Sequence, residues 1–483
     1  SGTSVAGSSP NTVTTSSGSI SATYTAKGCS GSDVITASAT VSSATLSATG
    51  TVTVASGTIG SIQFVSATPT TIGLKGTGLA ETSTVIFKVV DATGAARPGA
   101  SVNFSLDTTV GGLTLSPATA TSGADGTVQT VVSSGTQHTP VRVTAKIVSP
   151  ALSTQSSQLT VSTGLPASAG FSISVGSPSY ASSGLACPNV EAYGVDGVTV
   201  PVTVRLSDRY NNPVLDGTAV TFYTNGGHIA GSCTTPSAAG AADGTCTATW
   251  TSAQPRPMTT DNPPSKLDGR ATVLATTLGE ETFTDANGNG YWDSGEAFIH
   301  LGEPYDDANE NGMYDSGEYF LDFNKDGMRN PPDMSATAFK GITCSGSPLT
   351  CSNDSIAIGA SHLIIMSTSA ANITPVPTSL SVAHSTTTPP VTNTVGLQFT
   401  VVDLNGNAMP AGTTIAVTAD SAIGTLSGPG VNWTIGCDSG VGGVTLGVTL
   451  TAGTSAASGN ITITVTTPGT KTVTVLPVPV SVT

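Results

Sequence analysis

The sequence is poor in charged and in aromatic residues, which make up 9 % and 5 % of its 483 residues. So few aromatic side chains cannot fill large aromatic cores. With 15 basic against 30 acidic residues and a net charge of −15, the chain also lacks the positive surface that nucleic acids require. Ser, Thr, Gly, Ala and Val dominate instead. This composition suits several small β-sandwiches, and alternating Val and Ile along the whole length argue against disorder.

Segments that would cross or enter a membrane are also missing. No apolar run is long enough to span a bilayer, so we expect no membrane span. The chain starts at Ser1, without an initiating Met or a signal peptide. We therefore expect a processed product or a piece of a longer protein.

Catalytic motifs are absent as well. The sequence has no GxSxG elbow and no Gly-rich phosphate loop, and its five histidines lack zinc-ligand spacing. The histidines are His138, His228, His300, His362 and His384. The tryptophans Trp250, Trp292 and Trp433 are scattered, as packing residues usually are. We expect a protein that is not an enzyme.

The seven cysteines are spaced for local disulfides and form no CxxC metal or redox motif. We predict the pairs Cys233–Cys246 and Cys344–Cys351, and therefore an oxidising, extracellular or cell-surface location. In the chain-entropy model, the loop that the first pair closes would stabilise the folded state by roughly 3 kcal/mol. Cys29, Cys187 and Cys437 remain without an assigned partner.

One pattern occurs three times: a strand, a turn with Asp, Gly or Asn and then Pro, and a second strand. It spans 85–104, 202–222 and 397–417. In each copy the turn begins at an aspartate, Asp91, Asp208 or Asp403, and the second strand starts 11 or 12 residues later. Asp, Asn, Gly and Pro between two apolar strands are turn residues.

A second signal follows in the first two copies. Asp125-Gly126 and Asp243-Gly244 each precede an alternating strand, and a closing strand comes later, at 141–145 and 271–275. Short strands with turn signals every 8–12 residues are typical of an antiparallel sandwich. No segment has a helical period. The predicted fold class is all-β, with tandem Ig-like antiparallel β-sandwich domains.

We predict four domains: a partial domain at 1–58, complete domains at 59–164 and 373–483, and between them a domain at 165–372 that carries an insertion at about 279–354. The partial domain has only C-terminal strands, at 18–25 and 33–37. Such a half-sandwich would expose sheet edges and an apolar face. The chain is cut from a longer array, the missing strands lie outside the given sequence, or another subunit donates them; these alternatives remain open.

The Asp-x-x-Gly-x-x-x-Pro turn, the V-x-F strand, the Asp-Gly turn and the V-x-V-T-A closing strand together resemble bacterial Ig-like domain family 1. That family forms the stalks of invasin- and intimin-type surface proteins. The resemblance covers about 60–163 and 168–278, and 379–483 less well. It implies spacer domains that lift an adhesive tip from a cell. No segment matches the anchor or the receptor-binding tip, so neither role is carried over.

The acidic residues are concentrated in one block, because 280–333 holds fourteen of the thirty Asp and Glu. Three successive segments there fit the calcium-loop pattern D-x-[DN]-x-[DN]-G-x5-E, the third with Asp in the last position. Positions 1, 3, 5, 9 and 12 would supply side-chain oxygens, and position 7 a backbone carbonyl. The predicted calcium ligands are Asp285, Asn287, Asn289, Tyr291, Asp293 and Glu296 in the first loop, Asp307, Asn309, Asn311, Met313, Asp315 and Glu318 in the second, and Asp322, Asn324, Asp326, Met328, Asn330 and Asp333 in the third.

The terminal Asp333 is a short ligand, so we expect the third loop to bind more weakly. No long helices flank the loops, and the block resembles dockerin-type or thrombospondin-type calcium repeats more than an EF-hand switch. Calcium would fold a charged segment that has little core of its own, and its removal should loosen the segment.

Two functions remain in competition. The first is an extracellular structural protein of a bacterial surface, a stalk or filament subunit rigidified by calcium and disulfides, whose partners are copies of itself or adjoining repeats. The second is an adhesin or carbohydrate-binding module with a glycan or host-surface ligand. The alternating tail at 471–483 is an ordinary last strand or a strand offered to another subunit. Pro477 and Pro479 would restrict it to an edge.

Overall fold

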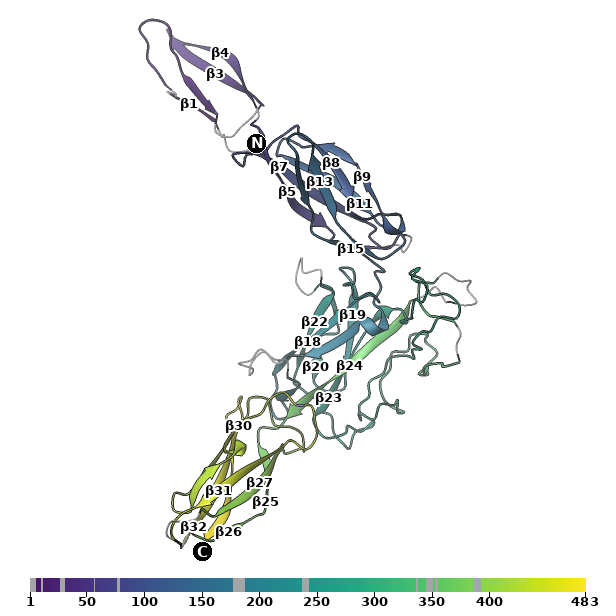
Figure 1. Ribbon diagram of the computed structural model, residues 1–483, viewed down its shortest axis with the longest axis vertical. Helices are drawn as coiled ribbons and strands as arrows, with labels where there is room; N and C mark the ends of the chain where they lie inside the picture. The colour runs from purple at the N-terminus through teal and green to yellow at the C-terminus, as the bar shows by residue number, and fades with distance from the viewer. Residues whose placement is uncertain are drawn as a thin grey trace. The chain divides into compact units, whose positions relative to one another are not determined.

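The computed structural model describes residues 6–9, 12–26, 31–55, 57–75, 79–176, 187–236, 243–335, 338–344, 351, 355–384, 387 and 392–483. Within them all regular elements are β-strands apart from three short 3-10 helices, so the all-β prediction is confirmed. The chain divides into two compact units, 1–164 and 165–483 (Figure 1). Cys29 lies outside the described residues.

The first unit contains one complete sandwich. Its facing sheets have the strand orders β5-β7-β11-β9 and β10-β8-β13-β14, and a small sheet β12-β15-β6 lies at one end. The strands are β5 (Ile59–Thr68), β6 (Thr71–Gly73), β7 (Thr82–Asp91), β8 (Ser101–Leu106), β9 (Thr114–Ser116), β10 (Thr119–Thr121), β11 (Thr127–Ser133), β12 (Thr139–Val141), β13 (Val143–Ile147), β14 (Leu152–Gln155) and β15 (Leu159–Ser162), with the 3-10 helix η1 (Val110–Gly112).

Upstream of this sandwich, β1 (Ala6–Ser9) pairs with β2 (Thr23–Ala26), and β3 (Gly31–Val41) pairs with β4 (Ala44–Val54). The strand expected at 18–25 therefore begins only at Thr23. The β3–β4 register places Ala39 opposite Leu46, and Leu46 is 62 % exposed. Within the described residues the β3–β4 sheet has two strands, and the hydroxyl of Tyr24 on β2 donates a hydrogen bond to the carboxylate of Asp33 on β3.

The second unit begins with another sandwich, whose sheets are β16-β18-β22-β20 and β17-β24-β23-β19-β21. The strands are β16 (Phe171–Val175), β17 (Asn189–Glu191), β18 (Thr199–Leu206), β19 (Ala219–Thr224), β20 (His228–Ile229), β21 (Ser232–Thr234), β22 (Thr245–Thr251), β23 (Arg270–Gly279) and β24 (Ile356–Ser367), with η2 (Ser168–Gly170). β24 runs without a break over its 12 residues.

The last sandwich has the sheets β25-β27-β31-β29 and β26-β33-β32-β28-β30. Its strands are β25 (Ala371–Val376), β26 (Leu380–Val382), β27 (Thr394–Asp403), β28 (Thr414–Ala419), β29 (Gly424–Ser427), β30 (Asn432–Thr434), β31 (Val444–Ala452), β32 (Ala457–Thr466) and β33 (Val473–Val482), with η3 (Pro429–Val431). The C-terminal tail is thus a strand of its own domain. β26 pairs with β33 only at 480–482, so Pro477 and Pro479 lie where one edge of β33 is unpaired.

The repeated aspartate has a local structural role. Oδ1 of Asp91 accepts hydrogen bonds from the N–H groups two and four residues later, at 2.8 and 2.9 Å. Asp208 and Asp403 make the same two contacts in their own sandwiches. The side chain therefore closes the turn between two strands by satisfying backbone donors that the sheet cannot reach.

Small apolar side chains fill the three cores, as the composition predicts. In the first sandwich Phe87 is fully buried, and its ring lies 5.8 Å from that of Phe104. In the second, the buried Trp250 donates a hydrogen bond from Nε1 to the carbonyl of Gly226 at 2.8 Å. Trp250 is therefore a packing residue with a satisfied polar group.

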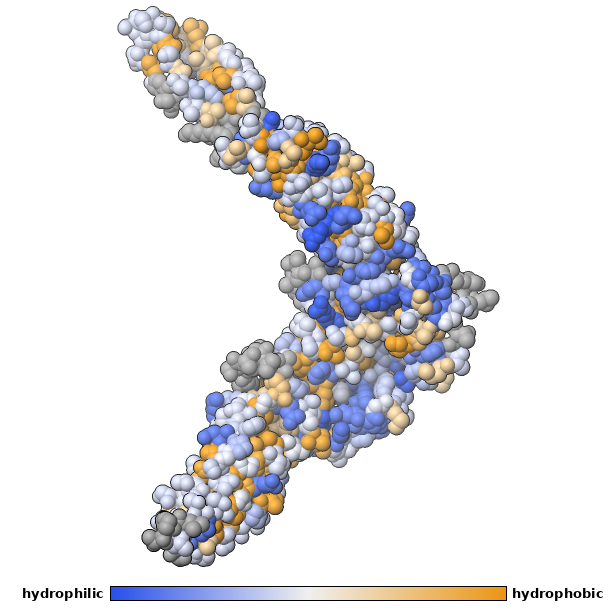
Figure 2. Space-filling view, in the orientation of Figure 1, coloured by the Kyte–Doolittle hydropathy of each residue, from blue (hydrophilic) through white to orange (hydrophobic). Residues whose placement is uncertain are grey.

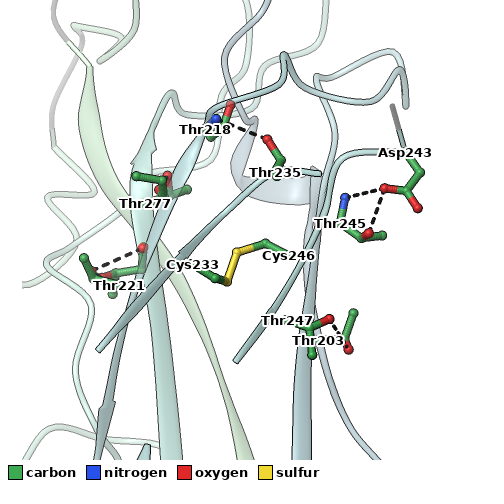
Figure 3. The surroundings of a disulfide bond; sticks show 12 residues. Thr203, Thr218, Thr221, Cys233, Thr235, Asp243, Thr245, Cys246, Thr247 and Thr277 are labelled. Atoms are coloured by element: carbon green, nitrogen blue, oxygen red, sulfur yellow. Dashed lines mark hydrogen bonds between the residues drawn. A yellow bond between two sulfur atoms is a disulfide. The ribbon is translucent and has the colours of Figure 1, made fainter. Parts of the chain in front are cut away.

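Three disulfides are present. Cys233–Cys246 (Figure 3) joins β21 and β22 across the second sandwich, and Cys344–Cys351 lies in the insertion, so both predicted pairs are confirmed. The third, Cys187–Cys437, was not predicted. It links residues 250 positions apart and connects the second sandwich to the last one.

Candidate metal centre and interdomain joint

The insertion is the long connection of one hairpin. β23 and β24 pair antiparallel over their length, from Arg270 opposite Ile365 to Gly279 opposite Ile356, and residues 280–355 leave and return at the Gly279 end. Hydrophilic residues cover much of its visible face (Figure 2). The insertion is therefore anchored at both ends in one sheet of the second sandwich.

Two buried glutamates fix the start of the insertion. The carboxylate of Glu280 accepts the hydroxyl of Thr343 at 2.7 Å, and that of Glu281 accepts the N–H groups of Leu301 and Lys340 at 3.1 and 2.8 Å. Burial raises the pKa of both carboxyl groups. They tie distant parts of the insertion together through backbone donors.

The insertion has a small aromatic core of its own. Phe283, Trp292 and Phe339 are buried, and the Trp292 and Phe339 rings are stacked with centroids 5.8 Å apart. Nε1 of Trp292 donates to the carbonyl of Glu296 at 3.0 Å. This core is small for a segment of this length, so polar contacts must determine much of its shape.

In the first predicted calcium loop, carboxylates hold the backbone in a closed turn. Oδ2 of Asp285, at position 1, accepts the N–H of Gly290 at 2.8 Å. The two oxygens of Glu296, at position 12, accept the N–H groups of Ala286 and Asp293 at 2.8 and 3.0 Å. The first and last ligand positions are therefore joined to the middle of the loop.

The second loop repeats these contacts. Oδ2 of Asp307 accepts the N–H of Gly312 at 2.8 Å, and Glu318 accepts those of Ala308 and Asp315, both at 2.9 Å. The glycine at position 6 has φ +78° here and +85° in the first loop, a left-handed conformation that favours glycine.

The third loop is closed by a different residue than expected. Oδ2 of Asp322 accepts the N–H of Gly327 at 2.9 Å, as in the other loops. The N–H groups at positions 2 and 9, of Phe323 and Asn330, donate to the two oxygens of Glu303, at 2.8 and 3.0 Å. Glu303 lies before the second loop in the sequence and takes the place that a glutamate holds at position 12.

Asp333, the predicted position 12 of the third loop, makes no such contact with the loop backbone. Its Oδ1 accepts the N–H and hydroxyl of Ser335, at 3.0 and 2.7 Å, in an exposed turn outside the loop. Pro331 and Pro332 precede Asp333, and proline has no N–H and a fixed φ, which favours this turn over a return to the loop. The sequence offered one signal for Glu303, since it was an unassigned acidic residue in the same block as the third loop, which lacked its glutamate.

The middle ligand positions also converge. The amide groups of Asn287 and Asn289 donate to Oδ2 of Asp293, at 2.7 and 2.6 Å, which brings positions 3, 5 and 9 of the first loop together. Asn309 and Asn311 approach Asp315 in the same way. In the third loop Asn324 donates to Asp326 at 2.9 Å.

At position 7, Tyr291, Met313 and Met328 use their N–H groups to bind the side chain at position 5, at 2.7 to 2.8 Å. In the part of the chain that the structure describes, no three His, Cys, Asp or Glu residues form a metal-sized cluster. The donor sets of these loops instead combine carboxylates with asparagine side chains.

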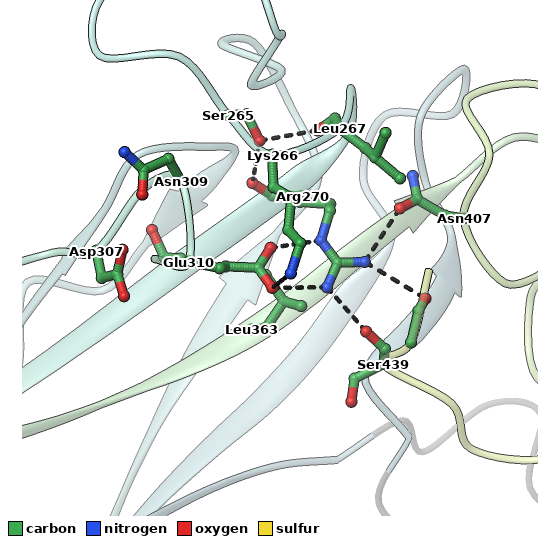
Figure 4. Close-up of polar contacts among 12 residues, drawn as sticks. Ser265, Lys266, Leu267, Arg270, Asp307, Asn309, Glu310, Leu363, Asn407 and Ser439 are labelled. Atoms are coloured by element: carbon green, nitrogen blue, oxygen red, sulfur yellow. Dashed lines mark hydrogen bonds and ion pairs between the residues drawn. The ribbon is translucent and has the colours of Figure 1, made fainter. Parts of the chain in front are cut away.

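A second polar network joins the insertion to both sandwiches of the unit (Figure 4). The guanidinium of Arg270, on β23, is 2 % exposed and pairs with both carboxylate oxygens of Glu310, at position 4 of the second loop. It also donates to Oδ1 of Asn407 at 3.1 Å and to the carbonyl of Ser439 at 2.8 Å, both in the last sandwich. Arg270 therefore contacts three parts of the chain at once.

Two residues beside the third disulfide complete this joint. The amide of Asn189 donates to the carbonyls of Met409 and Gly436, at 2.8 and 3.1 Å. The buried carboxylate of Glu191 accepts the N–H of Gly469 at 2.8 Å. β17, which carries both residues, thus supports the last sandwich beside the Cys187–Cys437 bond.

The repeat and calcium-loop patterns of the sequence gave no sign of the joint. Arg270 lies at the start of an ordinary closing strand, and its partners are 40, 137 and 169 residues away. The only sequence signal was the pair of unassigned cysteines, Cys187 and Cys437, which would have had to be matched across 250 residues.

No protein-family model matches the chain, and no curated protein sequence matches it. Among solved structures it is similar to FdeC, an Escherichia coli adhesin, at 18 % identity over 88 % of this chain and 96 % of that one, with a TM-score of 0.26. Invasin, a bacterial integrin-binding protein, is 15 % identical over 88 % of this chain and 60 % of that one, with a TM-score of 0.23. InvD of Yersinia pseudotuberculosis is 15 % identical over 87 % of this chain and 97 % of that one, with a TM-score of 0.25.

These neighbours are Ig-like domains of bacterial adhesins. At such identities and TM-scores the similarity supports no statement about a ligand or receptor. In the described residues, no helix has the length and apolar character needed to cross a bilayer.

Proposed function

We propose that this chain is a non-enzymatic, extracellular structural protein of a bacterial surface. It would be a stalk or filament subunit in which bound calcium holds the insertion in its folded conformation. The observation that carries the proposal is the contact pattern shared by the three loops. In each, one glutamate binds the N–H groups at positions 2 and 9, and the aspartate at position 1 binds the glycine at position 6.

The residues present fit a hard cation that prefers oxygen ligands. The side chains at positions 1, 3, 5, 9 and 12 would hold it in the first two loops, and Glu303 would replace position 12 in the third. A half-turn of each asparagine amide would present its oxygen in place of its nitrogen. Bound calcium supplies the positive charge that offsets repulsion among the clustered carboxylates.

The loops have a direct route to the sandwiches. Glu310 lies within the second loop with φ +58°, and its carboxylate is bound by Arg270. Because Arg270 also binds the last sandwich, the conformation of the second loop fixes the position of a residue shared by three parts of the unit. We infer that calcium stiffens the connection between successive sandwiches, as a stalk or filament requires.

Isothermal titration with calcium, followed by light scattering in calcium and in EGTA, tests the proposal. We expect one ion per loop and a more compact particle in calcium. A monomer in both conditions, with calcium bound, indicates a stalk segment. Assemblies that dissociate in EGTA indicate a filament subunit. A chain that binds no calcium and has the same hydrodynamic radius in both solutions would contradict the proposal.

A further inference from the structure

A small cavity lies between the second sandwich and the insertion, beside the second predicted calcium loop. Its volume is about 180 Å³. β19 contributes Tyr223, the segment before β23 contributes Asp261 and Ser265, and the insertion contributes Asp306 and Tyr319. This volume is enough for one side chain and too small for an extended ligand.

The carboxylate of Asp306 lines this cavity, and one of its oxygens has no hydrogen-bond donor. The residue is 1 % exposed, and its Oδ1 accepts no hydrogen bond. The ion pairs of the described residues involve Arg256, Lys266 and Arg270, and none of them reaches Asp306.

A buried carboxylate normally has a cation or several hydrogen-bond donors as partners. The lining of the cavity holds a second carboxylate, that of Asp261, and no Lys, Arg or His side chain. This lining favours a positively charged occupant.

The wall of the cavity distinguishes an organic cation from a metal ion. The rings of Tyr223 and Tyr319 are stacked, with centroids 3.9 Å apart and an interplanar angle of 11°. Tyr319 is 39 % exposed, so this aromatic pair extends from the buried sheet to the surface. Aromatic faces attract ammonium groups and pack against alkyl chains, whereas calcium needs six to eight oxygen ligands.

We propose that this cavity binds a primary alkylammonium group, such as the end of a lysine side chain, with Asp306 as its counter-ion and the Tyr223–Tyr319 pair as its aromatic wall. The ammonium has three donors for Asp306 and for two other polar groups of the lining, Asp261 and Ser265. The alkyl stem would lie along the tyrosine rings toward the surface. The site would give a stalk or filament subunit a point of attachment for a lysine-bearing partner.

Titration of the full chain with n-butylammonium and with Nα-acetyl-lysinamide, in saturating calcium, tests this proposal. We expect both probes to bind, and Asp306→Asn to weaken them by about tenfold or more, because a charge-assisted contact is lost. Tyr319→Ala should weaken them less. Tighter binding of the lysinamide would identify a protein side chain as the source, and tighter binding of butylammonium a free amine.

Asp306→Asn keeps the shape of the side chain and removes a buried charge without a partner, so the variant should fold. Asp216→Asn makes the same change at an exposed position of the same sandwich and should leave binding unchanged. Equal affinity for wild type and Asp306→Asn, or for butylammonium and n-butanol, would overturn the proposal, as would a folded wild type that binds neither probe. Calcium stoichiometry of Asp306→Asn should stay at the wild-type value, which separates this site from the calcium proposal.

Discussion

Arg270 and Glu310 form a two-point ion pair in which the arginine is almost completely buried and the glutamate retains 22 % exposure. The Nη2–Oε2 distance is 2.8 Å, and Nε contacts the other oxygen. The remaining donors of Arg270 are used by Asn407 and Ser439. The pair therefore couples a predicted calcium loop to the interface between two sandwiches.

Replacing Glu310 with Gln should destabilise the second unit by about 2–3 kcal/mol, since it leaves the Arg270 charge buried without a counter-charge. The value lies at the low end for a buried pair because Glu310 is partly solvated. Urea unfolding of the two proteins measures the difference.

The exposed pair Arg256–Asp196 provides the control for that comparison, because the Asp196 side chain is 73 % exposed. Asp196→Asn should change the free energy of unfolding by less than about 1 kcal/mol. Equal effects of Glu310→Gln and Asp196→Asn would mean that Arg270 does not hold the joint.

Glu303→Gln should abolish one calcium site, and Asp333→Asn should abolish none. The reason is that Glu303 binds the backbone at positions 2 and 9 of the third loop, whereas Asp333 turns toward Ser335. Isothermal titration calorimetry, which gives the number of calcium ions bound per chain, checks this. Glu296→Gln and Glu318→Gln are the matched variants, and each should bind one ion fewer than the wild type. Loss of a site in Asp333→Asn, with none lost in Glu303→Gln, would restore the assignment made from the sequence pattern.

Removing the Cys187–Cys437 disulfide with a double Ala variant should destabilise the connection between the last two sandwiches by about 2–5 kcal/mol. We expect limited proteolysis to release the last sandwich sooner than in the wild type. The Cys233–Cys246 double variant is the control, since that bond lies within one sandwich. Non-reducing peptide mapping that failed to link Cys187 to Cys437 would contradict the pairing.

Glu280 should make the protein less stable as the pH rises. Burial raises its pKa above the ordinary value of 4.5, so the folded state binds the proton more tightly than the unfolded chain does. Stability therefore falls as the pH rises from about 4.5 through the raised pKa. Glu280→Gln should increase the free energy of unfolding at neutral pH and have a smaller effect near pH 4.5.

Urea titrations at several pH values measure this dependence. Asp216→Asn also removes one carboxylate, but at an exposed position, and should change the free energy of unfolding little at any pH. A Glu280→Gln curve that runs parallel to the wild type across this range would show that Glu280 does not titrate with folding.

The sequence by itself determined the features that depend on short stretches of chain. The aspartate turns close within four residues, the calcium-loop contacts at positions 1 and 6 within five, and the two local disulfides within 13 and 7. Alternating apolar positions likewise predicted strands such as β7, β18 and β27, because one face of each strand is buried.

Only the tertiary structure decided which residues meet across long separations. Glu303, not Asp333, binds the backbone of the third loop because the chain folds back from before the second loop, and a repeat pattern contains no information about that path. Arg270 with Asn407, and Cys187 with Cys437, lie more than 130 residues apart and meet because two sandwiches pack together. Local turns follow from nearby donors and acceptors, whereas these contacts exist only once whole domains have buried their cores and fixed the positions of their ends.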